Sequence, residues 1–506
     1  MKLAKLIHGL KETENLEVAD REILGITNDS RKIKKGFMFV AIEGYKLDGH
    51  NYVADAINRG AIAIITGKYI RGFTNVSQIV VNDSRKALSG LSSCFFWQPS
   101  KKIKTIGVTG TNGKTTTTYL IKSIIDSAVR KSKSATCNQS YESGTGQESL
   151  VGLIGTIEYI IGKDILPARE TTPESVDLQN LLSQMIAQDL EYAVIEVSSQ
   201  ALVQHRTNDV EFYAATFTNI TLEHLDYHRN FFRYRAAKAM LFETLDSNSF
   251  AILNADDETG KYIANKTKAK IVWYGIENKA DVRCKVLKFL PDSTDIVLYY
   301  KKDEIKVKLP MIGLHNVYNA LAAAANGVAL GMDLDTIKNG ICKFDNIPGR
   351  LESVDYGQNF KVFVDYAHTA HALDVVLQSL RQTKLNGERL LLVFGCGGDR
   401  DRQKRSEMGK VAEKLADRFW ITNDNPRSED PLEIIDEIKT GIENGSAYSI
   451  QPDRKLAIKE AIKDAHEKDI VLIAGKGHET GQIIGDKVYQ FNDMEIVKET
   501  LVELRN

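Results

Sequence analysis

Residues 109–116 (TGTNGKTT) combine two glycines, a lysine and several hydroxyl side chains in one short run. An apolar run ending at Val108 precedes them, and a segment with helical periodicity, 117–125, follows. This order predicts a strand, a tight loop and a helix, whose N-terminal N–H groups and dipole bind phosphate. Lys114 can supply a positive charge for the β- and γ-phosphates, and Thr115 a hydroxyl ligand for Mg²⁺. Val108 occupies the first glycine position of the strict phosphate-loop pattern, but an ordinary glycine turn would not need a lysine and two hydroxyls together.

Acidic and imidazole side chains follow two other apolar runs. Glu196 lies near the end of the run 192–197, and His224 and Asp226 come shortly after 214–219. Ligands of open α/β sheets bind at the carboxyl ends of the parallel strands, where we also expect the phosphate loop. Carboxylate oxygens are suitable Mg²⁺ ligands, so these three side chains form a candidate metal cluster. A single histidine in such a loop would more often be an ordinary surface residue.

Two further polar features allow more than one interpretation. Lys238 lies among Ala, Leu and Phe in a predicted helix, 234–242, and its ammonium could simply reach water along an apolar surface. Residues 27–31 (TNDSR) are typical of an Asx or ST turn. Alternatively, Ser30 and Arg31 could contact a phosphate or a sugar.

The C-terminal third contains four buried strand-like runs, each followed by polar or glycine-rich residues. The runs are 362–364, 391–394, 418–422 and 470–473. The residues that follow them are 365–369 (DYAHT), 395–402 (GCGGDRDR), 423–427 (NDNPR) and 475–479 (GKGHE). Strands that alternate with helices predict a doubly wound sheet, and its carboxyl edge should gather these four ends in one crevice.

The bulk properties narrow the class of protein. A length of 506 residues suggests about three domains. The hydrophobic fraction of 43% and charged fraction of 26% are ordinary for a globular protein, and the net charge of -1 offers no field for nucleic acid or an acidic membrane. The five cysteines never occur as C-x-x-C, which argues against zinc and disulfides and favours a reducing cytoplasm. No apolar stretch is long enough to span a bilayer.

Turn-forming residues divide the chain into three predicted domains. Trp-Gln-Pro-Ser at 97–100 and Pro-Gly-Arg at 348–350 give the boundaries 1–100, 101–347 and 348–506. We expect an α/β fold in each, with the phosphate loop in the central domain.

Some local features of the central domain carry their own expectations. The polar segment 130–149 lacks apolar periodicity and is predicted to be a mobile surface loop. In 171–174 (TTPE), the proline is expected at the first position of a helix. Residues 270–310 alternate as antiparallel strands, and His315 or Asn316 is expected to cap the helix that follows.

Six motifs, which follow one another along the chain, carry a resemblance to a known protein family. They are 109–116, 196–199, 315–316, 348–350, 365–368 and 424–427. With them the chain resembles the Mur ligases over essentially its whole length, and within that family the branch that adds the third residue of the muramoyl peptide. The resemblance implies an N-terminal domain that holds the UDP end of the substrate, a central ATPase domain, and a Rossmann-like C-terminal domain that brings the amino acid.

The implied reaction is ATP-dependent amide formation on UDP-N-acetylmuramoyl-L-alanyl-D-glutamate. The glutamate carboxylate attacks the γ-phosphate to give an acyl phosphate and ADP, and the amine of the incoming amino acid then displaces phosphate. The implied partners are therefore small molecules and not nucleic acid or membrane. We expect a cytoplasmic monomer.

Site residues are carried over by motif position. The resemblance implies ATP contacts at Gly110, Thr111, Asn112, Gly113, Lys114, Thr115, Thr116, Asn316, Arg350 and Asp365. The implied Mg²⁺ ligands are Thr115, Glu196 and His224. The implied contacts of the UDP-muramoyl dipeptide are Ser30, His50, Thr171, Thr172, Ser198, Gln204 and Arg206. Lys238 matches the family's carbamylated lysine (N6-carboxylysine), which CO₂ forms and which supports a second Mg²⁺; with Lys114, Glu196 and His224 it makes the implied catalytic set.

The amino acid is expected from the motif Asp-Asn-Pro-Arg. In the family, arginine at its fourth position, here Arg427, is associated with meso-diaminopimelate, whose distal carboxylate a guanidinium can pair bidentately. The remaining implied contacts of diaminopimelate are Arg400, Asp424, Asn425, Gly475 and Glu479.

Departures from the family pattern leave alternatives open. Gln200 stands where histidine is usual, Ala370 and His371 stand where Pro-Asp is common, and the polar insertion at 130–149 is long. The alternatives are an L-lysine-adding ligase, a paralogue such as a folylpolyglutamate-synthase-like ligase, and a nucleotide-dependent binding protein that does not ligate.

Overall fold

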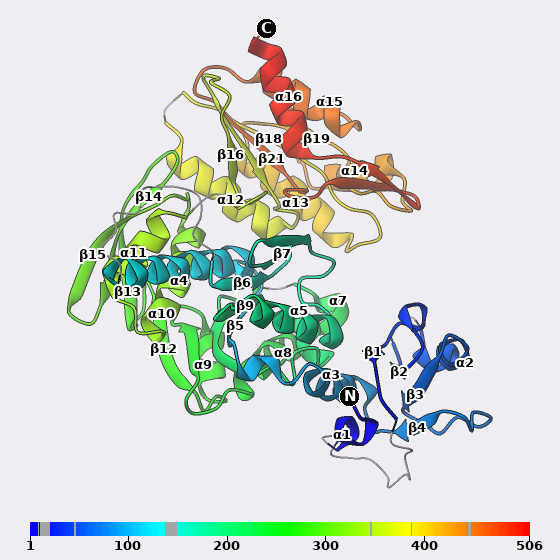
Figure 1. Cartoon of the computed structure of the whole chain (residues 1–506). Coiled ribbons are helices and arrows are strands. Elements are labelled where there is room, and N and C mark those ends of the chain that lie inside the picture. Colours follow the sequence, from blue (N-terminus) through cyan, green and yellow to red (C-terminus); the bar gives the residue numbers. More distant parts are fainter. Residues whose placement is uncertain are drawn as a thin grey trace. The chain divides into compact units, whose positions relative to one another are not determined.

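The computed structural model describes residues 1–8, 10, 21–44, 47–136, 149–221, 223–344, 347–385, 387–443 and 447–505. The chain divides into two compact units, Met1–Tyr274 and Gly275–Asn506, each built from helices and largely parallel strands (Figure 1). The predicted α/β class is confirmed. The three predicted domain boundaries stay predictions.

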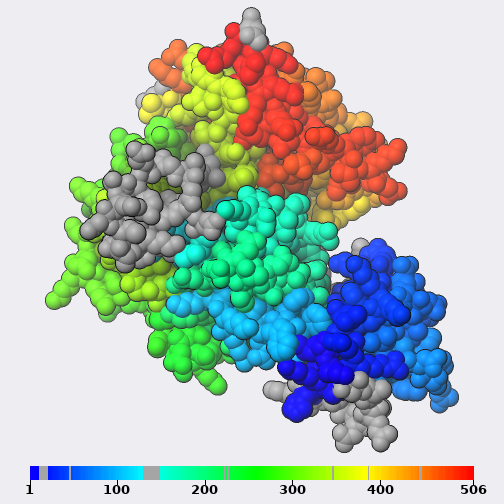
Figure 2. Space-filling model, viewed as in Figure 1, coloured from blue at the N-terminus to red at the C-terminus, as the bar shows by residue number. Residues whose placement is uncertain are grey.

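The first 100 residues form a four-stranded parallel sheet with helices on both faces. Its strand order is that of the chain: β1 (Gly25–Thr27), β2 (Phe37–Val40), β3 (Ala61–Thr66) and β4 (Ser77–Val80). One face packs on α1 (Leu3–Ile7) and α3 (Ser84–Phe95), and the other on α2 (Val53–Asn58). In Figure 2 the atoms of this segment, coloured blue, form one lobe of the unit's surface.

The larger sheet of the first unit places three strand ends side by side. Its strand order is β12–β11–β10–β5–β9–β6–β7–β8, and all but the last two strands pair in parallel. The bounds are β5 (Lys104–Thr109), β6 (Val151–Ile154), β7 (Glu158–Ile161), β8 (Asp164–Pro167), β9 (Tyr192–Glu196), β10 (Phe212–Phe217), β11 (Phe250–Asn254) and β12 (Lys270–Gly275). Because β5 lies between β9 and β10, Thr109, Glu196 and Phe217 end at one edge.

In the described part of the chain, six helices follow these strands. They are α4 (Lys114–Thr136), α5 (Ser175–Ala187), α6 (Ser199–Val203), α7 (Leu225–His228), α8 (Phe231–Glu243) and α9 (Glu258–Ala264). Among the described helices, none combines the length and apolar character that crossing a membrane requires.

Two local expectations for this unit are wrong. Residues 130–136 continue α4, because this part of the polar segment contains neither glycine nor proline to end a helix; residues 137–148 lie outside the described residues. Pro173 is not the first residue of a helix, since α5 begins at Ser175 with Glu174 as its N-cap.

The antiparallel prediction for 270–310 is wrong for its first strand, β12, which pairs in parallel with β11. The second unit opens with a set of antiparallel strands, as predicted. Its strands β13 (Val282–Phe289), β14 (Thr294–Tyr300) and β15 (Asp303–Leu309) are followed by α10 (Leu314–Ala329) and α11 (Leu334–Cys342). The cap prediction for α10 is wrong: Gly313 is the N-cap, at a φ of 94° that favours glycine. His315 and Asn316 lie in the first turn instead, and Asn316 donates to the carbonyl of Ile312 (2.9 Å).

The rest of the unit is a doubly wound sheet, with all four predicted strands in place. Its order is β16 (Glu352–Val354), β17 (Lys361–Asp365), β21 (Ile470–Ala474), β18 (Leu390–Phe394), β19 (Arg418–Ile421) and β20 (Tyr448–Ile450). Only β16 among these strands is antiparallel to its neighbour. Strands β16 and β20 and the hairpin of β22 (Gly481–Ile484) and β23 (Lys487–Gln490) were not predicted.

Helices cover both faces of this sheet. Leu392 and Phe394 point to the face of α12 (Ala370–Thr383), α13 (Gln403–Leu415) and α14 (Pro431–Lys439). Leu391 and Val393 point to α15 (Arg454–Asp464) and α16 (Asp493–Arg505). The fully apolar run of β18 thus reflects burial on both faces, and Figure 2 shows this part of the chain as a continuous yellow-to-red surface.

Candidate active site

The phosphate loop joins β5 to α4, as the sequence predicts. Gly113 has a φ of 84°, which is open to glycine at no steric cost. At Gly110 an added Cβ would lie 1.8 Å from Oγ1 of Thr218, so the loop packs against the end of β10. The loop is held there because the N–H of Thr111 donates to the carbonyl of Asn219 (2.8 Å). The helix N-terminus is thereby fixed at the sheet edge.

A hydroxyl and a carboxylate meet directly beside this loop. Thr115, on the first turn of α4, donates to Oε2 of the buried Glu196 (3.0 Å). Nζ of Lys114 donates to the carbonyls of Gly110 (3.1 Å) and Thr111 (2.8 Å). Two hard oxygen ligands next to a phosphate-binding loop fit Mg²⁺, which keeps waters and phosphate oxygens in most of its coordination sphere.

The structure places His224, another predicted metal ligand, beside Tyr234. The ring of His224 lies 5.9 Å from that of Tyr234, with His224 at a φ of 57°. The side chain of Asp226 lies outside the described residues. Among the residues that the structure describes, no three His, Cys, Asp or Glu side chains gather to hold a metal ion.

Lys238 is buried inside α8. Its side chain is 1% exposed, so the interpretation that its ammonium reaches water is wrong. Nζ lies 4.4 Å from the ring centroid of Tyr234, whose hydroxyl contacts Oγ1 of Thr111 in the phosphate loop (3.0 Å). Burial, with Lys114 nearby, holds the pKa of Lys238 well below its ordinary value. The lowered pKa favours the neutral, nucleophilic form of the amine.

The predicted muramoyl-peptide residues of the central domain form one connected group. Arg206 donates from Nη1 to the carbonyl of Thr172 (2.8 Å) and from Nε to Oε1 of Gln204 (3.1 Å). The N–H of Ser198 donates to Oγ1 of Thr172 (3.0 Å). Thr171 contacts the hydroxyl of Thr156 (3.1 Å). The structure brings all five predicted residues together.

Thr156 links this group to the metal-type pair. Its N–H and hydroxyl donate to the two carboxylate oxygens of Glu196, at 2.9 and 3.1 Å. Sequence analysis missed Thr156, which follows the β6 run without any motif of its own.

Ser30 lines a cavity of about 930 Å³ in the first unit. Its lining carries side chains of both charges: the basic ones are Arg31, Lys32, Arg85 and Arg169, and the acidic ones are Asp29, Asp55, Glu170, Glu174 and Asp177. The Asx-turn interpretation is confirmed, since a carboxylate oxygen of Asp29 accepts from the N–H of Arg31 (3.0 Å). His50 lies outside this lining: its ring contacts Asp48 (2.6 Å) and accepts from the N–H of Gly67 (3.0 Å).

In the second unit, Arg350 and Asp365 lie close together. Arg350 lies over the ring of Tyr366 at 4.9 Å. Burial raises the pKa of Asp365, although Arg350 and the N–H groups of Leu351 and Ala367 (both 2.7 Å) oppose the shift. The turn that contains Arg350 and the end of β17 thus form a compact polar cluster.

The ends of β19 and β21 share a buried polar cluster. Nδ2 of Asn425 donates to Glu479 (2.9 Å), and the fully buried Lys476 donates to both Glu479 (2.8 Å) and Asn425 (3.1 Å). A Cβ on Gly475 would lie 2.8 Å from Oδ2 of Asp424, a buried oxygen that lacks a hydrogen-bond partner among the described residues. Burial raises the pKa of Glu479, but Lys476, Asn425 and His478 together outweigh burial and the net pKa is lowered.

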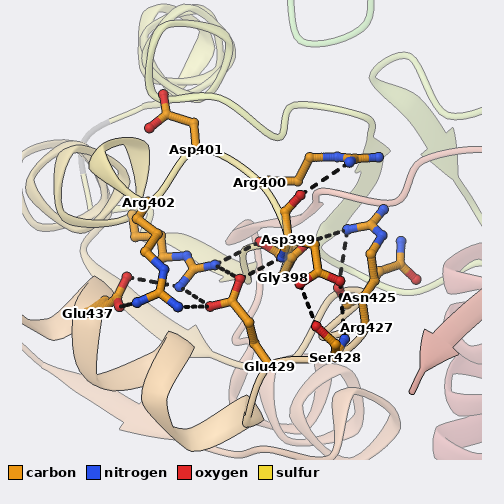
Figure 3. A network of polar contacts seen from close by, with 12 residues as sticks. Gly398, Asp399, Arg400, Asp401, Arg402, Asn425, Arg427, Ser428, Glu429 and Glu437 are labelled. Atoms are coloured by element: carbon orange, nitrogen blue, oxygen red, sulfur yellow. Dashed lines mark hydrogen bonds and ion pairs between the residues drawn. The ribbon is translucent and has the colours of Figure 1, made fainter. Parts of the chain in front are cut away.

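Two guanidinium groups border this cluster (Figure 3). Arg427 donates from Nη1 to the carbonyl of Gly398 (2.7 Å), and burial together with neighbouring Arg400 lowers its pKa. Two like charges held together favour an anionic ligand, whereas Asp424 and Glu479 favour a cationic one. The site thus offers both signs of charge at one sheet edge.

The first-unit geometry defines a class of protein. A helix N-terminus that carries lysine and threonine and opens onto a buried carboxylate is the arrangement of phosphate-loop enzymes, which bind nucleoside triphosphates. The second unit carries a polar cluster with side chains of both charges.

Comparison with known proteins identifies the family. Residues 22–93 match "Mur ligase family, catalytic domain", 108–327 match "Mur ligase middle domain" and 349–477 match "Mur ligase, glutamate ligase domain". One relative is the UDP-N-acetylmuramoyl-L-alanyl-D-glutamate--2,6-diaminopimelate ligase of Bacillus licheniformis. The two chains are 41% identical, and the match covers the full length of both. This chain is 42% identical to the ligase of the same name from Alkaliphilus metalliredigens, covering 99% of this chain and 98% of that one. A solved structure of that name matches with a TM-score of 0.69 and 30% identity, with complete coverage of both chains. This chain belongs to the Mur ligase family.

Proposed function

We propose that this protein is the ATP-dependent ligase that joins meso-2,6-diaminopimelate to UDP-N-acetylmuramoyl-L-alanyl-D-glutamate in peptidoglycan synthesis. Full-length relatives carry this name. The observation that most directly supports diaminopimelate as the amino-acid substrate is that Arg400 lies close to Arg427, with Asp424 and Glu479 beside them. Diaminopimelate carries a carboxylate and an ammonium at each end, whereas lysine lacks the distal carboxylate.

The first chemical step needs the γ-phosphate held for attack by the glutamate carboxylate. The α4 N-terminus and Lys114 bind the phosphates, and Asn316, Arg350 and Asp365 contact the nucleotide. Mur ligases use Mg²⁺ with ATP; Thr115 and Glu196 would hold it, and it would supply charge neutralisation at the phosphoryl oxygens. His224 is proposed as a further ligand.

The substrate is held in two places. The cavity at Ser30 is proposed to hold the UDP end, with the lining side chains Arg31, Lys32, Arg85 and Arg169 available to pair with the diphosphate, and His50 holds the turn nearby. The Thr172–Arg206 group orients the peptide end, where one carboxylate oxygen attacks the γ-phosphorus and ADP leaves. The amine of diaminopimelate then adds to the acyl carbon, phosphate leaves, and the ammonium proton passes to solvent or a base.

Steady-state ligation with diaminopimelate and with L-lysine tests the proposal. We expect diaminopimelate to be preferred, and Arg427→Ala to raise its KM at least tenfold while the KM of ATP stays within twofold, because a charge-assisted pair contributes about 1.5–3 kcal/mol. Arg381→Ala is the control, since Arg381 contacts Leu415 and Asp417 at the opposite end of the strands. A preference for lysine would favour the alternative, an L-lysine-adding ligase of the same type.

Lys238 is proposed to react with CO₂. The neutral amine adds to CO₂, one proton is lost, and the resulting carbamate is an anion close to the phosphate loop. The burial and lowered pKa of Lys238 support this chemistry. Native mass spectrometry in bicarbonate should show a gain of about 44 Da that Lys238→Met abolishes, by the addition of one CO₂; an unchanged mass would contradict it.

The protein is further proposed to act as a cytoplasmic monomer on small molecules, without nucleic acid. Its proposed substrates are all small molecules, and its net charge is -1. Size-exclusion chromatography with light scattering tests the monomer: a mass of 56.5 kDa is expected.

A further inference from the structure

The two arginines of the amino-acid site lie on two loops with unfavourable backbone conformations. Residues 395–402 follow β18 and residues 423–429 follow β19. Asp399 has a φ of 53° and Arg427 a φ of 54°, both in the left-handed region that non-glycine residues rarely adopt. Such conformations persist only where the surroundings fix them.

The loops are joined to each other by direct contacts. The N–H of Gly398 donates to the carbonyl of Asn425 (2.9 Å), and the hydroxyl of Ser428 donates to Oδ1 of Asp399 (2.6 Å). There is no space between them, since a Cβ on Gly398 would lie 1.9 Å from the carbonyl oxygen of Pro426. A shift of one loop therefore moves the other.

Glu429 connects both loops to the helices below them (Figure 3). Its Oε1 accepts a hydrogen bond from the N–H of Asp399, the residue with the positive φ. Its two carboxylate oxygens also accept from Nη1 and Nη2 of Arg405, both at 2.9 Å. Arg402 adds a contact at 3.0 Å. Glu429 is thus part of one loop and holds the backbone of the other.

Arg405 is the buried anchor of this arrangement. Its side chain is 0% exposed, and besides Glu429 it donates to Glu437 on α14 (2.9 Å) and to the carbonyl of Gly397 (3.2 Å). The bidentate pair with Arg405 holds the pKa of Glu429 at about 2, so Glu429 stays ionised at any physiological pH.

We propose that Glu429, clamped by Arg405, is a positioning residue that fixes the spacing of Arg400 and Arg427 and thereby sets the selectivity for an amino acid with a distal carboxylate. The inference rests on the proposed function, because that selectivity has meaning only if diaminopimelate is the substrate. Bidentate recognition by guanidinium groups depends on orientation, so a displaced backbone should weaken recognition of the carboxylate more than recognition of the rest of the amino acid.

The chain offers a matched control. Glu437 accepts from the same Arg405 and Arg402, at 2.9 and 3.2 Å, but both contacts are to side chains, and neither is to the backbone N–H of Asp399. Replacing either glutamate by glutamine keeps the size of the side chain and removes one charge from the same cluster. Only Glu429→Gln weakens the hold on Asp399.

The test compares Glu429→Gln, Glu437→Gln and the wild type by kcat/KM for meso-diaminopimelate and for L-lysine, by the KM of ATP and by thermal melting. For Glu429→Gln we expect the ratio of diaminopimelate to lysine kcat/KM to fall at least tenfold, with the KM of ATP within twofold. For Glu437→Gln the ratio should stay within twofold. Ser428→Ala, which removes the second tie to Asp399, should lower the ratio in the same direction and serves if Glu429→Gln does not fold.

Two results would overturn the inference. One is an equal loss of activity on both amino acids in Glu429→Gln that parallels its loss of melting temperature. The other is an unchanged ratio in Ser428→Ala when Glu429→Gln does not fold. Both leave the proposed function standing, whereas a wild type that does not ligate diaminopimelate would refute the proposed function and this inference together.

Discussion

At the scale of single residues, Gly110 shows how a backbone position can be specified by the space around it. An added Cβ would lie 1.8 Å from Oγ1 of Thr218, a side chain held by its bond to the carbonyl of Asn112 (2.7 Å). We expect Gly110→Ala to destabilise the protein by about 2 kcal/mol or more and to weaken ATP binding, as overpacking displaces the loop. Urea unfolding and ATP titration measure both effects.

The control for this prediction is Gly331→Ala. Gly331 also has a positive φ, of 80°, but no atom lies within 4 Å of its added Cβ. Its cost should be limited to backbone strain of about 1 kcal/mol, without an effect on ATP binding. Equal effects of the two substitutions would show that the contact with Thr218 is unimportant.

His478 predicts a pH dependence of stability. Burial and the nearby Arg350 lower its pKa from 6.5 to about 4. The unfolded chain therefore takes up a proton near pH 6.5 and the folded protein only near pH 4, so stability is complete above pH 6.5 and falls as the pH drops toward 4. Relative to His478→Gln, the wild type should lose up to about 3 kcal/mol over this range. Urea unfolding at several pH values tests this, and parallel pH profiles of the two proteins would contradict it.

At the scale of elements, one buried ion pair joins the two helices that cover the second face of the C-terminal sheet. Arg454 on α15 and Asp493 on α16 are both 0% exposed and meet at 2.8 and 2.7 Å, and Arg454 also donates to the carbonyl of Ala474 at the end of β21 (2.9 Å). Asp493→Ala leaves a buried charge unpaired and should cost about 3–5 kcal/mol. Guanidinium unfolding provides the measurement.

An exposed pair on the same helices is the reference. Lys459 and Glu503 meet at 2.8 Å, but Glu503 is 54% exposed, so Glu503→Ala should destabilise the protein far less than Asp493→Ala. The double change Arg454→Met with Asp493→Leu should recover much of the loss, because apolar packing avoids the desolvation penalty. A small effect of Asp493→Ala would mean that water or another group compensates Arg454.

Sequence predicted elements well where burial determines residue type. The runs that became β5, β9 and β18 are buried almost throughout. The conspicuous residues that end or follow them, such as Lys114 and Glu196, needed only the rule that strand ends carry ligands. Sequence analysis failed where a contact joins residues that are far apart in the sequence. Thr156 and Glu429 lie in polar segments without a pattern, and their partners, Glu196 and Asp399, are 40 and 30 residues away.

The wrong expectations have a common cause. The first turn of a helix can be displaced by one or two residues at little cost, so a proline or an asparagine does not fix its start. Pro173 and His315 were placed by such local signals, whereas tertiary contacts decide the boundary. Similarly, a polar segment without breakers, such as 130–136, can remain helical when it extends a stable helix.

At the scale of the whole molecule, the chain's two compact units and its three family matches do not share boundaries. The first unit ends at Tyr274, within the middle-domain match of residues 108–327. A compact unit is thus not the same as a family domain. What makes a segment able to fold alone is a core of its own, and the sheet of β16–β21 has one on each face.

We therefore expect the fragment 348–506 to fold by itself. Apart from Ile312, every buried residue of its two core clusters lies within the fragment, including those of α12–α14 on one face and of α15 and α16 on the other. A fragment shortened to 348–491 loses α16, with Ile496, Val497 and Leu501, and so exposes one face of the sheet. Circular dichroism and urea unfolding should show a cooperative transition for 348–506 and none for 348–491. If 348–506 lacks a cooperative transition, the packing of Ile312 and the α10 region on α12 is required for folding, and unit two folds only as a whole.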